Sequence, residues 1–221
     1  MQILLAPIEA RIIASLIEKE ITTPDQYPLS VNALTNACNQ KTNRDPVLAL
    51  TEREVQDSLD ALSKRHLVME RSGFGSRVMK YRHRFCNGDH NPLQMTPQEV
   101  AVLCELMLRG PQTLGELRSR AQRLAPFTDL ADVETTMEML ATRPDGPFVV
   151  KLPRQPGSRE SRYAQLLTGG EPDLDALAQQ AVAAAPQDIR DTPSLMQRME
   201  ALEAEVAALR AEIEAIRATR D

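Results

Sequence analysis

Hydrophobic residues recur at helical spacing in the stretch that begins at Thr51. This residue and Glu54 form a capping box, which favours the start of a helix. Three apolar residues then follow at positions i, i+4 and i+7 of one stripe: Val55, Leu59 and Leu62. The pattern changes at Leu67 to a short strand, a Gly-containing turn and a second strand over 77–85. Helix, strand, turn and strand in this order are typical of the second half of a winged-helix domain.

Two more helices are predicted before that stretch. The first covers 7–20, and a shorter one over 31–39 is capped by Ser30. The segment 22–28 between them contains two prolines, so it cannot be helical. Three helices and a hairpin predict a first winged-helix domain over residues 1–92.

The same pattern recurs in the second half of the chain. Residues 97–106 match 7–16 with an offset of 90, and residues 132–143 match 54–65 with an offset of 78. A short helix and a pair of strands occupy the corresponding places between and after these helices. The agreement in order and spacing predicts a second winged-helix domain over 93–168.

The chain ends in a pattern that favours pairing of two chains. Residues 169–193 are interrupted by Gly and Pro and are predicted to be a linker. In 194–221 the apolar residues are spaced 4, 3, 4, 3, 4, 3, as in a heptad seam. Flanking charges favour a parallel two-stranded coiled coil and hence a homodimer; the alternative is an amphipathic helix that folds back on its own chain. The seam consists of Leu195, Met199, Leu202, Val206, Leu209, Ile213 and Ile216.

Composition narrows the class of protein. With 42% apolar and 26% charged residues, the chain has the composition of a soluble globular protein. Only 3% of the residues are aromatic and none is Trp, which suits helical cores, so we expect a mainly α fold with small β-hairpins. No apolar run approaches the ~20 residues of a membrane helix, so no membrane partner is expected. The three cysteines show no paired spacing, which fits a cytoplasmic protein.

Basic residues gather in the first predicted hairpin. The segment 71–85 contains five Lys or Arg and no acid. Strand alternation places Lys80, Arg82 and Arg84 on one face, which suits contacts with DNA phosphates. The alternative is a solvated face that protects a strand edge from aggregation. Two more cations precede the Thr51 helix, and the candidate nucleic-acid-binding residues are Lys41, Arg44, Arg77, Lys80, Arg82 and Arg84.

The helices that would read bases are acidic instead. The helix after Thr51 carries Glu52, Glu54, Asp57 and Asp60, and its second copy carries Asp129, Asp132, Glu134 and Glu138. Carboxylates along a phosphate-lined groove are repelled, so base recognition by these helices is disfavoured. Either the hairpin contacts DNA or the paired domains bind another protein.

No catalytic or cofactor motif is found. His83, Cys86 and His90 are residue types that bind zinc, but the paired spacing of a four-ligand site is missing, so we expect structural roles and no metal. The chain has no Gly-rich phosphate loop, no nucleophile elbow and no His with an obvious acid partner. We therefore expect neither cofactor nor catalysis.

One long segment resembles a known family. Residues 18–30, EKEITTPDQYPLS, continue through Cys38-Asn39-Gln40-Lys41 to 43–47, and together they resemble the YceH family of bacterial proteins. Lys80-Tyr81 and His83-Arg84-Phe85 are also similar. The resemblance implies tandem winged helices and no particular activity.

The paired domains more distantly resemble segregation and condensation protein B, a chromosome-partitioning adaptor that works through protein contacts. Our leading hypothesis from the sequence is a dimeric tandem winged-helix protein that associates with double-stranded DNA in a regulatory role, without catalysis. The alternative is a protein–protein adaptor.

Overall fold

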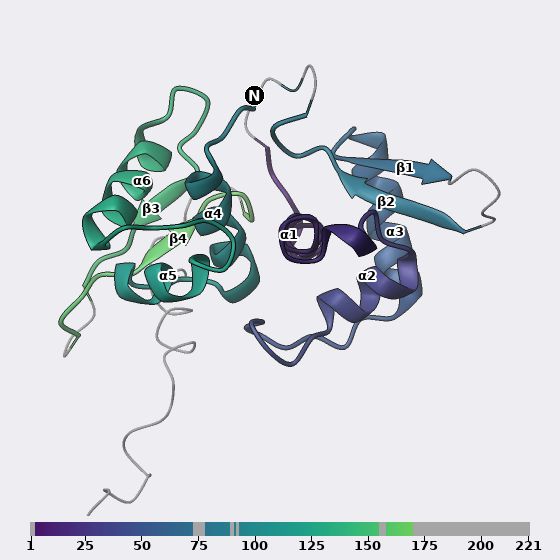
Figure 1. The fold of residues 1–221 in the computed structure, drawn as a ribbon, viewed down its shortest axis with the longest axis horizontal. Coiled ribbons are helices and arrows are strands. Elements are labelled where there is room, and N and C mark those ends of the chain that lie inside the picture. The colour runs from purple at the N-terminus through teal and green to yellow at the C-terminus, as the bar shows by residue number, and fades with distance from the viewer. Residues whose placement is uncertain (1–2, 73–77, 89–90, 92, 155–157, 170–221) are drawn as a thin grey trace, which may run out of the picture. The chain divides into compact units, whose positions relative to one another are not determined.

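A computed structural model describes most of the chain before residue 170 (Figure 1). The described residues are 3–72, 78–88, 91, 93–154 and 158–169. The predicted coiled-coil seam, the linker from residue 170 onward, Arg77 and His90 lie outside them, so the predictions on these residues stay predictions.

The first half of the described chain contains three α-helices and a hairpin. The elements are α1 (Pro7–Thr22), α2 (Val31–Cys38), α3 (Glu52–Lys64), β1 (Val68–Ser72) and β2 (Met79–His83), with a short 3-10 turn, η1 (Pro24–Gln26), after α1. α1 runs to Thr22, past its predicted end at residue 20, and stops before Pro24, because proline lacks the N–H that would continue the helix. The prediction that 22–28 is not helical is wrong for Thr22 and for the 3-10 helix at Pro24–Gln26.

The second half repeats this order. Its elements are α4 (Pro97–Arg109), α5 (Leu114–Ala121), α6 (Leu130–Thr142), β3 (Val149–Lys151) and β4 (Tyr163–Gln165). In Figure 1 the purple-to-blue elements form the first group and the teal-to-green elements the second. The predicted combination of helices with small antiparallel hairpins is confirmed. Within the described ranges, no helix is long and apolar enough to cross a bilayer.

Local side-chain contacts explain where the helices begin. The Thr51 hydroxyl accepts from the Glu54 amide, and the Glu54 carboxylate accepts from the Thr51 amide, as the sequence predicted. The same reciprocal contacts begin α4 at Thr96 and α5 at Thr113. Ser30 caps α2 through the amide of Ala33. Each cap satisfies amide groups that have no partner inside the helix.

The repeat extends to tertiary contacts. Arg65, just after α3, lies 2.9 Å from the carboxylate of Glu9 at the start of α1. Arg143, just after α6, lies 3.1 Å from the carboxylate of Glu99 at the start of α4. Each arginine also donates to a main-chain carbonyl in the segment before that same helix. The two halves therefore share one internal ion pair as well as one order of elements.

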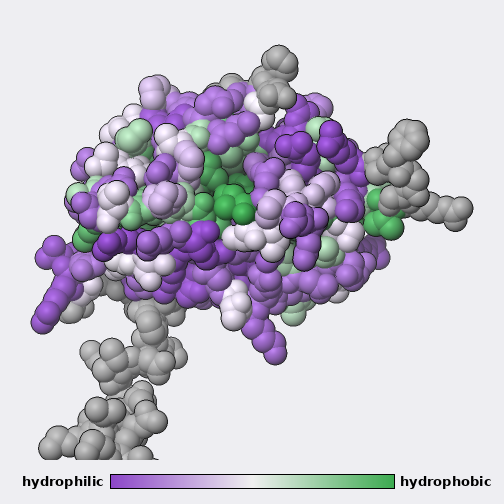
Figure 2. Space-filling view, in the orientation of Figure 1, coloured by the Kyte–Doolittle hydropathy of each residue, from purple (hydrophilic) through white to green (hydrophobic). Residues whose placement is uncertain are grey.

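The halves pack together through α1 and α4. The Cys104 thiol lies 3.3 Å from the Ala14 carbonyl, and these two positions are related by the same offset of 90 that relates the helices. Contact between equivalent positions is what a two-fold relation produces. A single core of buried residues includes both helices, so the halves are joined by hydrophobic packing. Figure 2 shows a mostly hydrophilic face with a hydrophobic patch in its middle.

Candidate functional site

The first hairpin presents its cations on one side. β1 and β2 are antiparallel, with Arg71 opposite Lys80, and opposite residues project to the same side of a ladder. Lys80 and Arg84 are exposed, whereas Tyr81, His83 and Phe85 are buried, so the predicted alternation is confirmed from Lys80 onward. Met79, which the alternation places on the inward face, is exposed. We call the side formed by Arg71, Lys80, Arg82 and Arg84 the basic hairpin face. Arg71 was not among the candidates from the sequence, because only the strand register places it opposite Lys80.

The other predicted cations lie elsewhere. Lys41 is exposed in the loop after α2. Arg44 is buried, with only 4% of the residue exposed, and its guanidinium contacts the Glu18 carboxylate at 2.5 Å and the Ala37 carbonyl at 2.8 Å. The expected place of Arg44 on the binding surface is therefore corrected, since its charge is used inside the fold. Arg82 is half-buried and lies 3.8 Å from Glu20.

Arg44 belongs to a buried ionic cluster that links the halves. Arg123, which follows α5, lies 2.7 Å from Glu18 on α1 and 2.6 Å from Glu105 on α4. Both carboxylate side chains are almost completely buried. Burial alone raises the pKa of Glu18, but the hydrogen bond and charge of Arg44, with the charge of Arg123, outweigh it and lower that pKa. Glu18 is therefore ionised, and the cluster ties the two central helices to each other.

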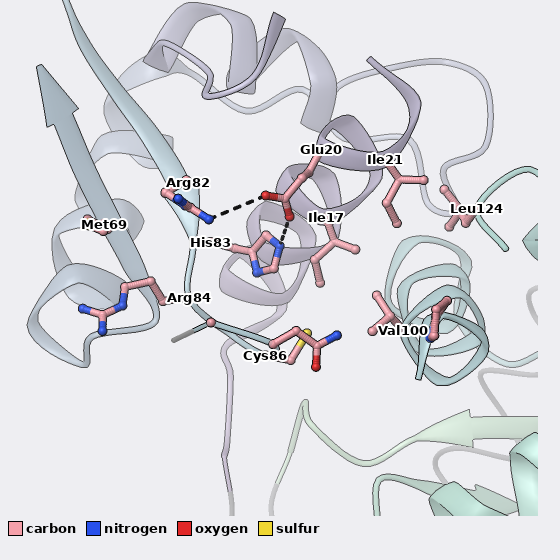
Figure 3. A pocket seen from close by; sticks show the side chains of 13 residues that line it. Ile17, Glu20, Ile21, Met69, Arg82, His83, Arg84, Cys86, Val100 and Leu124 are labelled. Atoms are coloured by element: carbon pink, nitrogen blue, oxygen red, sulfur yellow. Dashed lines mark hydrogen bonds and ion pairs between the residues drawn. The ribbon is translucent and has the colours of Figure 1, made fainter. Parts of the chain in front are cut away.

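A cavity of about 560 Å³ lies beside this junction (Figure 3). α1, the first hairpin, the segment after β2 and the second half all contribute to its lining. Its apolar wall includes Ile17, Ile21, Val100 and Leu124, and its polar wall includes Glu20, Arg82 and His83. We call it the α1–hairpin cavity. The sequence did not indicate it, because its residues come from segments far apart in the chain.

Three polar side chains meet at its polar wall. His83 Nε2 lies 2.6 Å from a carboxylate oxygen of Glu20, and Figure 3 shows Arg82 turned toward the other oxygen. The hydrogen bond from His83 lowers the pKa of Glu20 against the opposing effect of burial, and the charges of His83 and Arg82 add to the lowering. An ionised Glu20 accepts from Nε2–H. This leaves Nδ1 of His83 buried and without a hydrogen-bond partner among the described residues.

Cys86 also lines the cavity, but its thiol is unreactive at neutral pH. Burial, with the negative charge of Glu20, raises the pKa of its thiol to about 12. At neutral pH the sulfur stays protonated, and a protonated thiol is a poor nucleophile and a poor metal ligand. His83 already uses Nε2 to contact Glu20. In the part of the chain that the structure describes, no three His, Cys, Asp or Glu side chains gather in a way that could hold a metal ion.

The exposed faces of the third helix in each half are acidic. α3 buries its apolar stripe and exposes Glu52, Glu54, Asp57 and Asp60. Its one cation within that run, Arg53, reaches Asp57 only at 3.9 Å, with both side chains largely exposed. α6 exposes Glu134 and Glu138. The acidic residues that the sequence placed on these two helices are therefore on their exposed faces.

Comparison with known proteins places the chain in a family. A family model described as "Protein of unknown function, DUF480" matches residues 5–158. A UPF0502 protein of Klebsiella pneumoniae is 56% identical over 193 residues, which cover 87% of each chain. The UPF0502 protein YceH of Salmonella paratyphi B is 54% identical over 197 residues, covering 89% of this chain and 88% of the relative. The resemblance to YceH is thereby confirmed, and the chain belongs to the DUF480 family, alongside the bacterial UPF0502 proteins that include YceH.

Proposed function

We propose that the chain is a tandem winged-helix protein that associates with double-stranded DNA through the basic hairpin face, without a catalytic step. The repeated order of three helices and a hairpin supports the winged-helix assignment. The observation that carries the DNA proposal is the exposure of Arg71, Lys80 and Arg84 on one side of the hairpin. The one acid of the described strands, Glu70, stands opposite Tyr81 and so belongs to the other side.

The proposed contacts are with phosphates rather than with bases. The acidic exposed faces of α3 and α6 are repelled by the walls of a groove, so neither helix is expected to enter one. Cations on a hairpin neutralise phosphates and position the protein without selecting a sequence. Affinity should therefore depend steeply on salt and weakly on base sequence.

Dimerisation would strengthen such binding. The heptad seam of 194–221 supports a parallel pair of chains and hence two basic hairpin faces in one assembly. Two linked sites bind one duplex more tightly than either alone when both can reach it. Sedimentation of the full chain and of a chain lacking 194–221 tests this. We expect the full chain to be a dimer and the shortened chain a monomer. A monomeric full chain contradicts the proposal.

Salt-titrated binding to a fluorescent duplex tests the DNA proposal. The variant combines Arg71→Gln, Lys80→Gln and Arg84→Gln, and we expect it to bind at least about tenfold more weakly at low salt and to flatten the salt dependence. The control removes three exposed cations outside the hairpin face: Arg53→Gln, Lys64→Gln and Arg154→Gln. It carries the same net charge and should bind like the natural chain. Equal weakening in both variants contradicts a specific role for the hairpin.

A protein adaptor is the second candidate function, and the acidic faces of α3 and α6 favour it. Two negative surfaces on one chain suit a basic partner. Absence of duplex binding at low salt, with full folding, would favour this function over the first.

A further inference from the structure

The α1–hairpin cavity has the size and the two-sided chemistry of a small-molecule site. Its volume of about 560 Å³ falls inside the range of roughly 300–1,000 Å³ that is usual for ligand pockets. One wall is aliphatic and the other carries a few converging polar groups, which is the usual division between affinity and orientation in such sites. Of the polar-wall residues, Glu20 and His83 take no part in the proposed DNA surface, whereas Arg82 belongs to both sites.

Arg82 has unused hydrogen-bonding capacity at the polar wall. Its Nε is buried and has no partner among the described residues, and its nearest contact with Glu20 is 3.8 Å, longer than a hydrogen bond. A guanidinium offers five donors in a planar fork that matches a carboxylate. A buried donor without a partner, here Nε, is costly, so a ligand that completes the hydrogen bonds of this half-buried side chain gains affinity.

The charge balance of the wall favours an anion. Glu20 and Arg82 cancel each other, and the neighbouring cation Arg84 also lines the cavity. We propose that the cavity binds a small organic carboxylate with an apolar body. The carboxylate accepts hydrogen bonds from Arg82, and the apolar body packs against Ile17, Ile21 and the facing residues of the second half (Figure 3).

Such a ligand would also affect the basic hairpin face, because Arg82 belongs to both sites. A carboxylate on Arg82 neutralises a charge that otherwise faces phosphates, so ligand and DNA should weaken each other's binding by the same factor. This consequence rests on the proposed function. The ligand site itself does not, and it is tested without DNA.

The test is calorimetric titration of the full chain with decanoate, a carboxylate with an aliphatic body, and with decanol as its uncharged match. We expect saturable binding of decanoate and weaker binding of decanol. Arg82→Gln should weaken decanoate at least about tenfold, because charge-assisted hydrogen bonds are lost. Glu20→Gln should tighten it roughly twofold to fivefold, because a negative charge near the carboxylate is removed while an amide can still contact His83.

Two further variants separate a ligand role from a structural one. Ile21→Trp places bulk at the cavity from a position that is 40% exposed, and it should weaken decanoate without changing the thermal melting of the chain. Lys80→Gln removes a cation from the same strand but outside the cavity lining, and it should leave decanoate affinity unchanged within about twofold.

Three results would overturn the site. They are decanol binding as tightly as decanoate, unchanged affinity in Arg82→Gln, and weaker binding in Glu20→Gln as well as in Arg82→Gln. The absence of saturable binding would overturn it too. A failure of the DNA proposal looks different: Lys80→Gln would leave DNA affinity unchanged, while the binding of decanoate and its loss in Arg82→Gln would remain.

Discussion

The two hairpins of the repeat use their cations differently. In the second hairpin, Arg162 donates to the Glu116 carboxylate at 2.9 Å and to the Pro111 carbonyl at 2.8 Å. Lys151 lies over the ring of Tyr163 at 5.6 Å. Lys151 is nevertheless exposed, as are Arg71, Lys80 and Arg84 in the first hairpin, where the half-buried Arg82 lies 3.8 Å from Glu20. The repeat has kept the contacts that fold each half, while Arg162 of the second hairpin is held by its own chain and Lys80 of the first hairpin is not.

This difference has a physical basis. A cation that is held by a carboxylate and a carbonyl of its own chain must lose those contacts before it can neutralise a phosphate. A solvated cation on a strand loses only water and some side-chain freedom. Arg71, Lys80 and Arg84 are therefore better suited to recognition than Arg162, whose contacts stabilise its own half.

The largest expected effect comes from breaking the cluster that joins the halves. Glu18→Gln leaves Arg44 buried without its charge partner, which should lower the free energy of unfolding by about 3 kcal/mol or more. Urea denaturation at neutral pH measures this. A loss below about 1 kcal/mol would show that the cluster is not a main link between the halves.

The pH dependence of the free energy of unfolding tests the same cluster. The pKa of Glu18 is lowered from its ordinary 4.5 in the folded chain, so its ionised form stabilises the fold above that value. The contribution is lost as pH falls through the lowered folded pKa. Urea denaturation over a pH series should therefore show a steeper acid loss in the natural chain than in Glu18→Gln. Parallel curves would contradict the role of this carboxylate.

The ion pair that occurs in both halves should contribute to stability in each, by less than the Glu18 cluster does. Arg65→Gln and Arg143→Gln each remove a contact to the first helix of their own half. We expect about 1 kcal/mol for Arg65, which is 39% exposed, and somewhat more for Arg143, which is 20% exposed and also contacts Asp145. Denaturation of both variants under one condition checks the order. If Arg143→Gln left the free energy of unfolding unchanged, the ion pair would make no net contribution to stability.

The hairpins should differ in stability as well. Arg162→Gln removes two internal hydrogen bonds and should cost about 1 kcal/mol, whereas Lys80→Gln should stay within about 0.5 kcal/mol of the natural chain. Thermal melting of the two variants provides the comparison. The reverse order would mean that the exposed cations, not the engaged ones, hold the fold.

The smallest expected effect concerns the acidic helices. Asp57→Asn with Asp60→Asn reduces repulsion near the first hairpin and should tighten DNA binding roughly twofold. The matched change on α6, Glu134→Gln with Glu138→Gln, should leave DNA affinity unchanged if only the first half contacts the duplex. Equal tightening by both changes would indicate a general charge effect. Fluorescence anisotropy at fixed salt measures both.

Local signals account for what the sequence could predict. The capping box at Thr51 and the stripe of Val55, Leu59 and Leu62 specify α3, because both act within one helix. The alternation around Tyr81 specifies which side of β2 is buried. The repeat was visible because the spacing of apolar positions is kept in both halves.

Long-range pairings account for what the sequence could not predict. Arg44 lies in a polar loop, which predicts an exposed side chain. Its guanidinium instead donates to the buried carboxylate of Glu18, 26 residues earlier. The acid partner of His83 is Glu20, 63 residues away, and no spacing rule connects them. Glu18 and Glu105 are the signals that could have been noticed, because each interrupts a helix of otherwise buried residues. A carboxylate among apolar residues needs a buried cation from elsewhere in the chain.

The most direct test of the central claim is the salt dependence of duplex binding, measured side by side for Lys80→Gln and Arg162→Gln. If Lys80 contacts a phosphate, the slope of log affinity against log salt becomes shallower by about 0.9 in Lys80→Gln, as for the loss of one phosphate contact. Arg162→Gln should keep the slope of the natural chain. An unchanged slope in Lys80→Gln, or an equal change in both variants, would contradict the division of roles between the two hairpins.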